Sequence, residues 1–196
     1  GLTITKKEVE TYVKAKGSKQ IFQAVQPARG KTVAESLDSR WMMDLIMFVN
    51  QPVVVAGKTL RYILVAINVF DRYLYALPLE SKEPGEVKTA LERLLSLALK
   101  KPKLISSDQG LEFKGVVSAF LVKKGIAQKF KDMGDVNGIG VIDKAIQSLK
   151  QRLAQLSTGG GTWASVLARA VAGINNTPKP GVLHGAAPKE VRDDDD

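Results

Sequence analysis

The sequence predicts an α/β domain: a five-stranded mixed sheet flanked by helices. Two observations predict it. Apolar, β-rich runs at 38–50, 60–70 and 73–79 follow one another with short connections, which is typical of an antiparallel meander. After residue 80 the hydrophobic residues recur at helical spacing, and two further apolar runs alternate with these helical segments. Strands followed by alternating helices and strands indicate a mixed sheet with helices on its faces.

The elements after the meander follow from the same periodicity. In order, we expect a helix over 84–100, a strand over 103–105, a helix over 116–124 closed by Gly125, a strand over 126–131, a Gly-rich loop over 132–140, helices over 141–156 and 163–174, and an irregular tail with a last turn after Pro188. Residues 51–57 are predicted to be a plain connection. Trp41 and Trp163 are predicted to be core residues.

The chain of 196 residues has the length of one domain with, at most, a small appendage. We predict an N-terminal arm or small appendage over 1–37, a core over 38–191, and an acidic tail over 192–196. The first residue is Gly, which is consistent with trimming or with removal of a leader.

The composition restricts the functional class. No cysteine and a single histidine exclude disulfides and Cys/His zinc modules, and no apolar run reaches the ~18 residues of a membrane span. There are 29 Lys and Arg against 20 Asp and Glu, a formal charge of +9. Four of the acids are the last four residues, so the rest of the chain carries +13. This charge favours a polyanionic partner, although a basic protein without such a partner is the competing interpretation.

Three aspartates stand at positions that can converge. Asp44 lies within the first predicted strand, Asp108 follows the fourth, and Asp143 opens a later helix. Converging carboxylates repel unless cations neutralise them, and oxygen ligands without Cys or His suit Mg²⁺ or Mn²⁺. Each has an ordinary alternative, because Asp is common in turns and in the first turn of a helix. Asp132 and Asp135 are further candidates in the Gly-rich loop.

Four blocks carry a family resemblance: WMMDL at 41–45, RYILVAINVFDRYLYALPL at 61–79, SSDQGLEFKG at 106–115 and GVIDKAIQSLKQRL at 140–153. In this order they resemble the catalytic core of retroviral-type integrases, in the DDE transposase group with a ribonuclease H-like fold. The resemblance extends to the N-x-x-P and H-G-x-x-P elements, here Asn175, Pro178, His184 and Pro188. Residues 1–37 resemble the segment that precedes the core in integrases of Polinton-like transposons.

The resemblance implies a role for each matched residue. Asp44, Asp108 and Asp143 fall on the three catalytic, metal-binding positions, and Asp143 follows Asp108 by the family's spacing of 35 residues. The third residue of the family is usually Glu. Two Mg²⁺ or Mn²⁺ ions there would serve DNA end cleavage and strand transfer. Gln109, Gln147 and Lys150 fall where the family contacts DNA. An active integrase would be a nuclear homo-oligomer.

Two alternatives remain open. The zinc-binding and C-terminal DNA-binding modules of many integrases are not recognisable, and Asp143 replaces the usual Glu. These departures favour a domesticated, non-catalytic subunit of a larger organellar or ribonucleoprotein assembly, with protein partners. The other alternative is a ribonuclease H-like nuclease, which would draw a Glu from the helix after the third strand. Glu86 and Glu92 are the candidates there, without a supporting motif.

Overall fold

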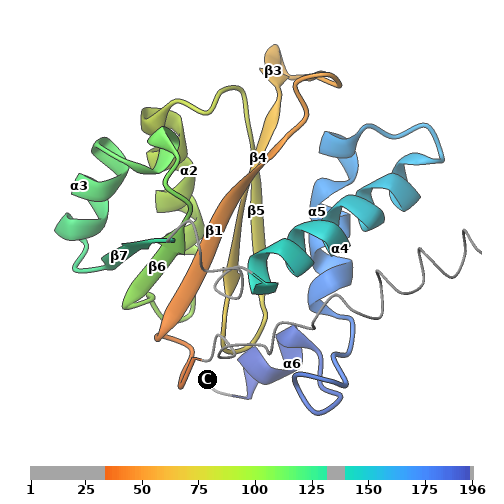
Figure 1. Ribbon diagram of the computed structural model, residues 1–196. Coiled ribbons are helices and arrows are strands. Elements are labelled where there is room, and N and C mark those ends of the chain that lie inside the picture. Colours follow the sequence, from red (N-terminus) through yellow and green to blue (C-terminus); the bar gives the residue numbers. More distant parts are fainter. Residues whose placement is uncertain (1–33, 132–139, 195–196) are drawn as a thin grey trace, which may run out of the picture. The chain divides into compact units, whose positions relative to one another are not determined.

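The computed structural model describes residues 34–131 and 140–194 (Figure 1). The strands in this part are β1 (Arg40–Met47), β2 (Val53–Val55), β3 (Lys58–Leu60), β4 (Tyr62–Asn68), β5 (Leu74–Leu79), β6 (Leu104–Ser107) and β7 (Ala127–Phe130). The helices are α2 (Pro84–Ser96), the 3₁₀ turn η1 (Leu111–Phe113), α3 (Val116–Lys123), α4 (Gly140–Ser157), α5 (Trp163–Asn175) and α6 (Pro188–Asp193). None of these helices combines the length and the apolar character that crossing a bilayer requires.

The predicted mixed sheet is confirmed. Its five strands lie in the order β5-β4-β1-β6-β7. The meander β1, β4 and β5 pairs antiparallel, whereas β6 pairs parallel with β1, and β7 pairs parallel with β6. Parallel neighbours require crossover connections, and α2 and α3 supply them.

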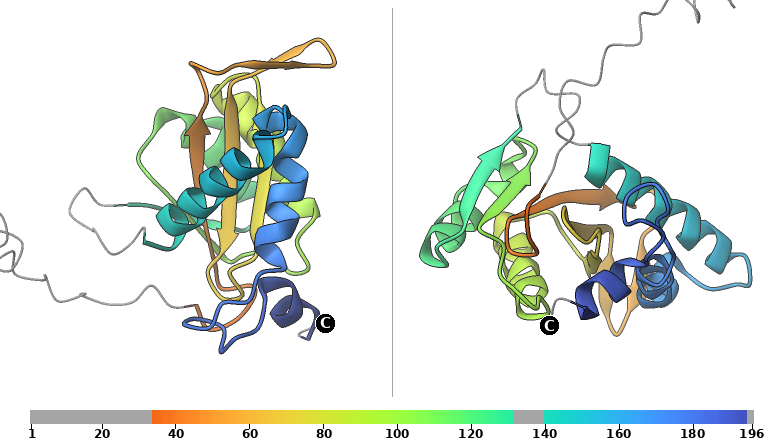
Figure 2. Two further views of the ribbon diagram at one scale, coloured as in Figure 1. Left: turned by 90° about the vertical axis from the view of Figure 1, so that its right-hand side faces the viewer. Right: turned by 90° about the horizontal axis from the view of Figure 1, so that it is seen from below.

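Helices cover both faces of the sheet (Figure 2). One apolar core lies between the sheet and the pair α2 and α3, and the other between the sheet and the pair α4 and α5. Successive residues of β1 alternate between the two cores: Trp41 and Met43 join the first, and Met42 and Ile46 join the second. Trp41 and Trp163 are 1% and 6% exposed, as expected of core residues.

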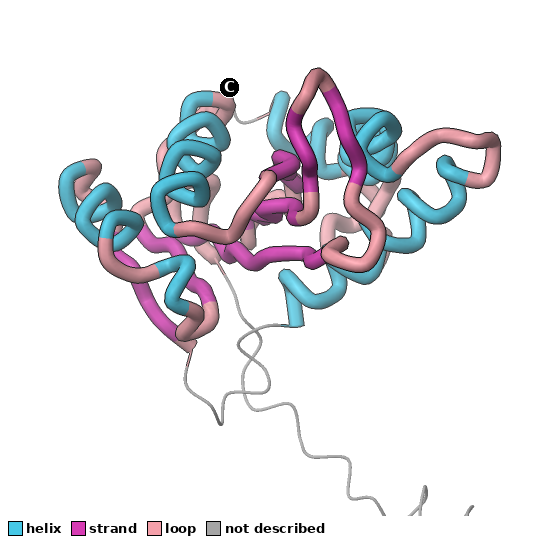
Figure 3. The backbone as a smooth tube through the Cα atoms, turned by 90° about the horizontal axis from the view of Figure 1, so that it is seen from above, coloured by secondary structure: helices cyan, strands magenta, loops and turns pink. Residues whose placement is uncertain are grey.

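Three predictions of local structure were wrong. Residues 53–60 form the hairpin β2–β3, which extends beyond the main sheet (Figure 3), instead of a plain connection. Its turn places Ala56 and Gly57 at φ 48° and 78°, the signature of a two-residue I′ turn. The helix α2 ends at Ser96 rather than at residue 100, and Leu99, expected on its buried face, is 44% exposed. The segment predicted as an acidic tail begins inside α6, where Arg192 is buried against Tyr73. The expected loop over 132–140, with Asp132 and Asp135, falls largely outside the described residues, as does most of the expected arm over 1–37.

Asn175 joins α5 to the start of β5. Its buried side-chain amide donates to the Leu74 carbonyl (2.9 Å), and its side-chain oxygen accepts from the Leu74 N–H (2.8 Å). The amide thus satisfies both backbone groups of one residue, as a neighbouring strand would. This contact accounts for the asparagine of the N-x-x-P element in structural terms.

Asn175→Ala is expected to lower the free energy of unfolding by about 2–3 kcal/mol, because two buried backbone groups of Leu74 lose their partners. Chemical denaturation followed by circular dichroism measures the change. Asn176→Ala is the matched control, since that exposed side chain bonds only the Ala172 carbonyl of its own helix. Equal losses in both variants would contradict this role for Asn175.

Candidate active site

The sheet register brings two of the three predicted carboxylates together. Asp44 shares the strand face of Met42 and Ile46, the face that α4 and α5 cover. Met42 pairs with Ser106 across the parallel strands β1 and β6. Two residues further along each strand are Asp44 and Asp108, so the alignment places them side by side at one end of the strands.

The helix α4 supplies the third carboxylate. Asp143 lies in its first turn, on the exposed side of the helix, while Ile142, Ala145 and Leu149 of the same helix are buried. Asp44, Asp108 and Asp143 all line one cavity of about 160 Å³. The structure therefore collects the three aspartates, which are far apart in sequence, at the junction of β1, β6 and α4.

Electrostatics within this cavity oppose ionisation of Asp44. Burial is the main cause that raises the pKa of the Asp44 carboxyl, and the charges of Asp108, Asp143 and Glu112 contribute to the net value of about 6. A hydrogen bond from the Leu45 N–H to Asp44 Oδ1 (2.7 Å) acts in the opposite direction. A cation at this position would relieve the same repulsion.

A fourth carboxylate, Glu112, lies near enough to raise the pKa of Asp44 and was not predicted. Asp108 Oδ1 accepts from the Gly110 N–H (3.0 Å), which forms a tight turn just after β6. The Glu112 carboxylate folds over Gly110, because a Cβ built there would lie 2.6 Å from Glu112 Cδ. Any side chain at 110 would displace that carboxylate. Glu112 occupies the E of the D-Q-G-x-E-F element, which was the available signal.

Cationic side chains line the same cavity and were also not predicted. Lys129 and Lys131 come from β7 and its end, and Arg40 comes from the start of β1. Arg40 Nε donates to the Ser106 hydroxyl (3.0 Å), which holds its side chain beside β6. A cavity lined by both carboxylates and cations can hold a metal-bound phosphate, because the carboxylates can bind the metal ion and the cationic side chains can bind the phosphate.

Solved structures of other proteins show the same fold as this chain. The chain matches the BIV integrase catalytic core domain with a TM-score of 0.64 at 21% identity, over 81% of this chain and 95% of that one. It matches an HTLV-2 integrase catalytic core solved in complex with magnesium in a trimeric form, with a TM-score of 0.65 at 14% identity, over 82% and 99% of the two chains. The chain folds as an integrase-type catalytic core.

Sequence relatives agree with this core. An uncharacterized transposon-derived protein of Caenorhabditis elegans is 30% identical over 132 residues, which cover 66% of this chain and 45% of that protein. The Gag-Pol polyproteins of Koala retrovirus and Walleye dermal sarcoma virus are 30% and 28% identical, covering 65% and 68% of this chain and 8% of each polyprotein. The chain thus spans less than half the length of these relatives. No protein-family model matches it.

The donor set of the integrase-type core fits a hard divalent cation, because it consists of carboxylates with no Cys or His. In the described ranges, however, no three such side chains converge closely enough to enclose a metal ion. Asp108 and Asp143 are exposed, whereas Asp44 is partly buried. The cavity is therefore open between the carboxylates, and closing it onto an ion requires them to approach one another.

The three residues expected to contact DNA lie in different surroundings. Gln109 is exposed, and its Nε2 donates to the backbone carbonyl of Lys131 (3.2 Å), which places it at the rim of the acidic cavity. Gln147 is exposed on α4, one turn beyond Asp143, and its Oε1 accepts from Lys144 Nζ (3.0 Å). Lys150 lines a separate cavity of about 490 Å³, next to Trp163.

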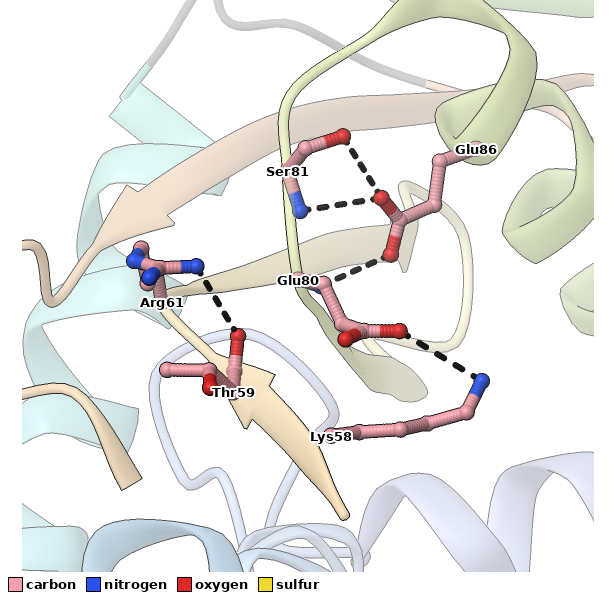
Figure 4. Close-up of polar contacts among 6 residues, drawn as sticks. All are labelled: Lys58, Thr59, Arg61, Glu80, Ser81 and Glu86. Atoms are coloured by element: carbon pink, nitrogen blue, oxygen red, sulfur yellow. Dashed lines mark hydrogen bonds and ion pairs between the residues drawn. The ribbon is translucent and has the colours of Figure 1, made fainter. Parts of the chain in front are cut away.

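The two glutamates that a ribonuclease H-like nuclease would use have other partners, and Figure 4 shows those of Glu86. Glu86 accepts from the Glu80 N–H, the Ser81 N–H and the Ser81 hydroxyl at 2.7, 2.9 and 2.6 Å, which ties the start of α2 to the end of β5. Glu92 pairs with Lys88 at 2.8 Å and Lys124 at 4.0 Å. Neither lines the acidic cavity, which removes the support for that alternative.

Proposed function

We propose that this chain is the catalytic core of a DNA integrase or transposase, a polynucleotidyl transferase that cleaves a DNA end and joins it to a target. The proposal depends on one observation, the placement of Asp44, Asp108 and Asp143 on a single cavity of an integrase-type core. The net charge of +9 supports a polyanionic partner. The trimeric form of the HTLV-2 integrase core supports an oligomer.

The three aspartates would hold two Mg²⁺ or Mn²⁺ ions. Bound there, the ions would supply a lowered pKa for the attacking water or 3′-hydroxyl and a clamp on the leaving oxygen. Asp44 is the central ligand, because both other aspartates act on its charge. Lys129 and Lys131 provide positive charge for a phosphodiester on the same wall. Gln109, at the rim, would contact DNA beside the reacting phosphate.

The deciding experiment is an assay of the purified chain on labelled duplex DNA with recessed and blunt ends. The expected result is nicking and joining that require Mg²⁺ or Mn²⁺ and that cease in EDTA. Binding of Mn²⁺, followed by electron paramagnetic resonance, provides a reading independent of turnover. Absence of both nicking and Mn²⁺ binding would overturn the proposal.

A second candidate is a domesticated, non-catalytic subunit of a larger assembly. The open arrangement of the carboxylates in the described part of the chain favours it, together with Asp at the third position. In that case the fold would serve as a scaffold, with DNA or protein partners but no turnover. The same assay separates the two candidates.

Replacements at position 143 test the third ligand directly. If the core is catalytic, Asp143→Glu is expected to retain or raise cleavage, because one more methylene extends the carboxylate of an exposed side chain toward the cavity. Asp143→Asn is expected to lower cleavage by about 100-fold, since the amide is a neutral and weaker metal ligand. Initial rates of nicking at saturating Mn²⁺ measure both. Equal rates in the two variants would exclude Asp143 from the metal site.

A further inference from the structure

A second cavity lies beside the first turns of α4, on a different side from the acidic one. It has a volume of about 210 Å³ and shares no lining residue with the acidic cavity. Its walls come from the end of β4, the β4–β5 turn, the starts of β5 and α4, the end of α5 and the segment after it. Four elements distant in sequence therefore enclose it.

An excess of positive charge among its lining residues distinguishes this cavity. Arg72, Lys144 and Lys179 line it, and none of the described lining residues is acidic. Arg72 Nη1 is buried and has no hydrogen-bond partner in the described part of the chain. Burial lowers the pKa of Lys179, and the nearby charge of Lys144 lowers it further. Burial likewise lowers the pKa of Arg72, against the opposing charge of Asp71.

The cationic side chains that line this cavity point to a ligand. Arg72 Nη1 is itself covered by neighbouring atoms, so an occupant would meet other atoms of Arg72 and the side chains of Lys144 and Lys179. The first turn of α4, where Gly140 and Val141 also line the cavity, adds the positive end of a helix to the three cations. An oxyanion satisfies both features, because it accepts from a guanidinium and neutralises lysines.

The remaining walls specify the rest of the ligand. They are aliphatic, and comprise Ile67, Leu74, Val141, Ala145, Ile174 and Val182. A bare inorganic anion leaves such walls without a partner, whereas an apolar group attached to the anion would bury against them. The volume is below the ~300 Å³ at which pockets for drug-sized ligands begin, which restricts the occupant to a small group.

We propose that this cavity binds a small organic oxyanion, a phosphate or carboxylate carried on an apolar body, with Arg72 and Lys179 as its anion ligands. The site goes beyond the proposed function, because binding requires neither the metal nor the acidic cavity. Two sources share this chemistry: a terminal nucleotide of bound DNA, and a free small-molecule anion.

Phenyl phosphate is the probe, measured by calorimetric titration and chemical-shift perturbation in EDTA. Inorganic phosphate and phenol, its two fragments, are each expected to bind at least about tenfold more weakly than the whole. Arg72→Gln and Lys179→Met are each expected to weaken binding of phenyl phosphate by about tenfold. Lys189→Met, at an exposed position of α6, is the matched control and is expected to bind as the wild type does.

Lys179→Met guards against misfolding, because the Lys179 N–H keeps its bond to the Ala186 carbonyl (2.9 Å) whatever the side chain. Unchanged affinity in both variants, or equal affinity for phenol and phenyl phosphate, would overturn the proposal. A short duplex that displaces phenyl phosphate from the wild type would identify the DNA terminus as the source, and failure to displace it would identify a free anion. Since no metal or turnover is involved, this result is independent of the cleavage assay.

Discussion

Asp44→Asn is expected to abolish metal-dependent DNA cleavage and, at the same time, to stabilise the metal-free protein at neutral pH. Cleavage should fall by at least about 100-fold, because Asp44 is the partly buried carboxylate between the two exposed ones. The unfolding free energy at pH 7.5 should rise by about 2 kcal/mol, because a buried charge and its repulsion are removed. The Asn side-chain oxygen can still accept from the Leu45 N–H.

The opposite signs of the two effects make the test specific. A core that merely tolerates a buried aspartate would gain stability on this replacement without losing metal-dependent cleavage, whereas a metal site would gain stability and lose cleavage. Chemical denaturation in EDTA and nicking rates in Mn²⁺ measure the two quantities. Asp38→Asn is the control, because Lys103 pairs with Asp38 at 2.7 Å and lowers its pKa, so that removal of this charge is expected not to stabilise. A destabilised Asp44→Asn protein would refute the electrostatic account.

The main sheet could be predicted because its pattern is local. Each strand of the meander is a run of apolar residues. In β1 the successive residues Met42 and Met43 face the two different cores, so both faces of this strand are apolar. The hairpin β2–β3 could not be predicted in this way. Its turn puts Ala56 at a positive φ. Such a turn is usually predicted from an Asn-Gly or Asp-Gly pair, and Ala at the first position gives no such signal.

The residues of the candidate site likewise divide into those that local sequence predicts and those that it does not. Asp44, Asp108 and Asp143 could be predicted because each lies in a sequence block and at a position set by secondary structure. Lys129 and Arg40 reach the cavity only through the parallel registers of β6 with β7 and β1, and no short-range pattern encodes these registers. Lys150 lies on the same helix as Asp143, but it is about two turns further along, where it lines another cavity.

The stability of the metal-free protein is expected to fall by about 2 kcal/mol as the pH rises from about 4 to about 6.5. The pKa of Asp44 is about 6 in the folded protein, above its ordinary value of 3.8, so the folded state holds the proton over this interval and the unfolded state does not. Protonated Asp44 therefore stabilises the fold at the lower end, and this contribution is lost as the pH passes about 6.

Two other carboxylates shift in the opposite direction. The pKa values of Asp38 and Glu92 are lowered by Lys103 and Lys88, so their contributions to stability are lost as the pH falls rather than as it rises. Unfolding by urea at half-unit steps of pH measures the slope, which should be nearly absent in Asp44→Asn. At pH values above 6, added Mg²⁺ is expected to raise the urea concentration at the midpoint of unfolding, because the ion binds the ionised carboxylate. At pH 4.5 it is expected to have little effect on this midpoint. Two results would contradict this account: an equal rise of the urea midpoint in NaCl of the same ionic strength, or a dependence of stability on pH that persists in Asp44→Asn. Either would show that the charge of Asp44 does not link proton binding and metal binding to the stability of the fold.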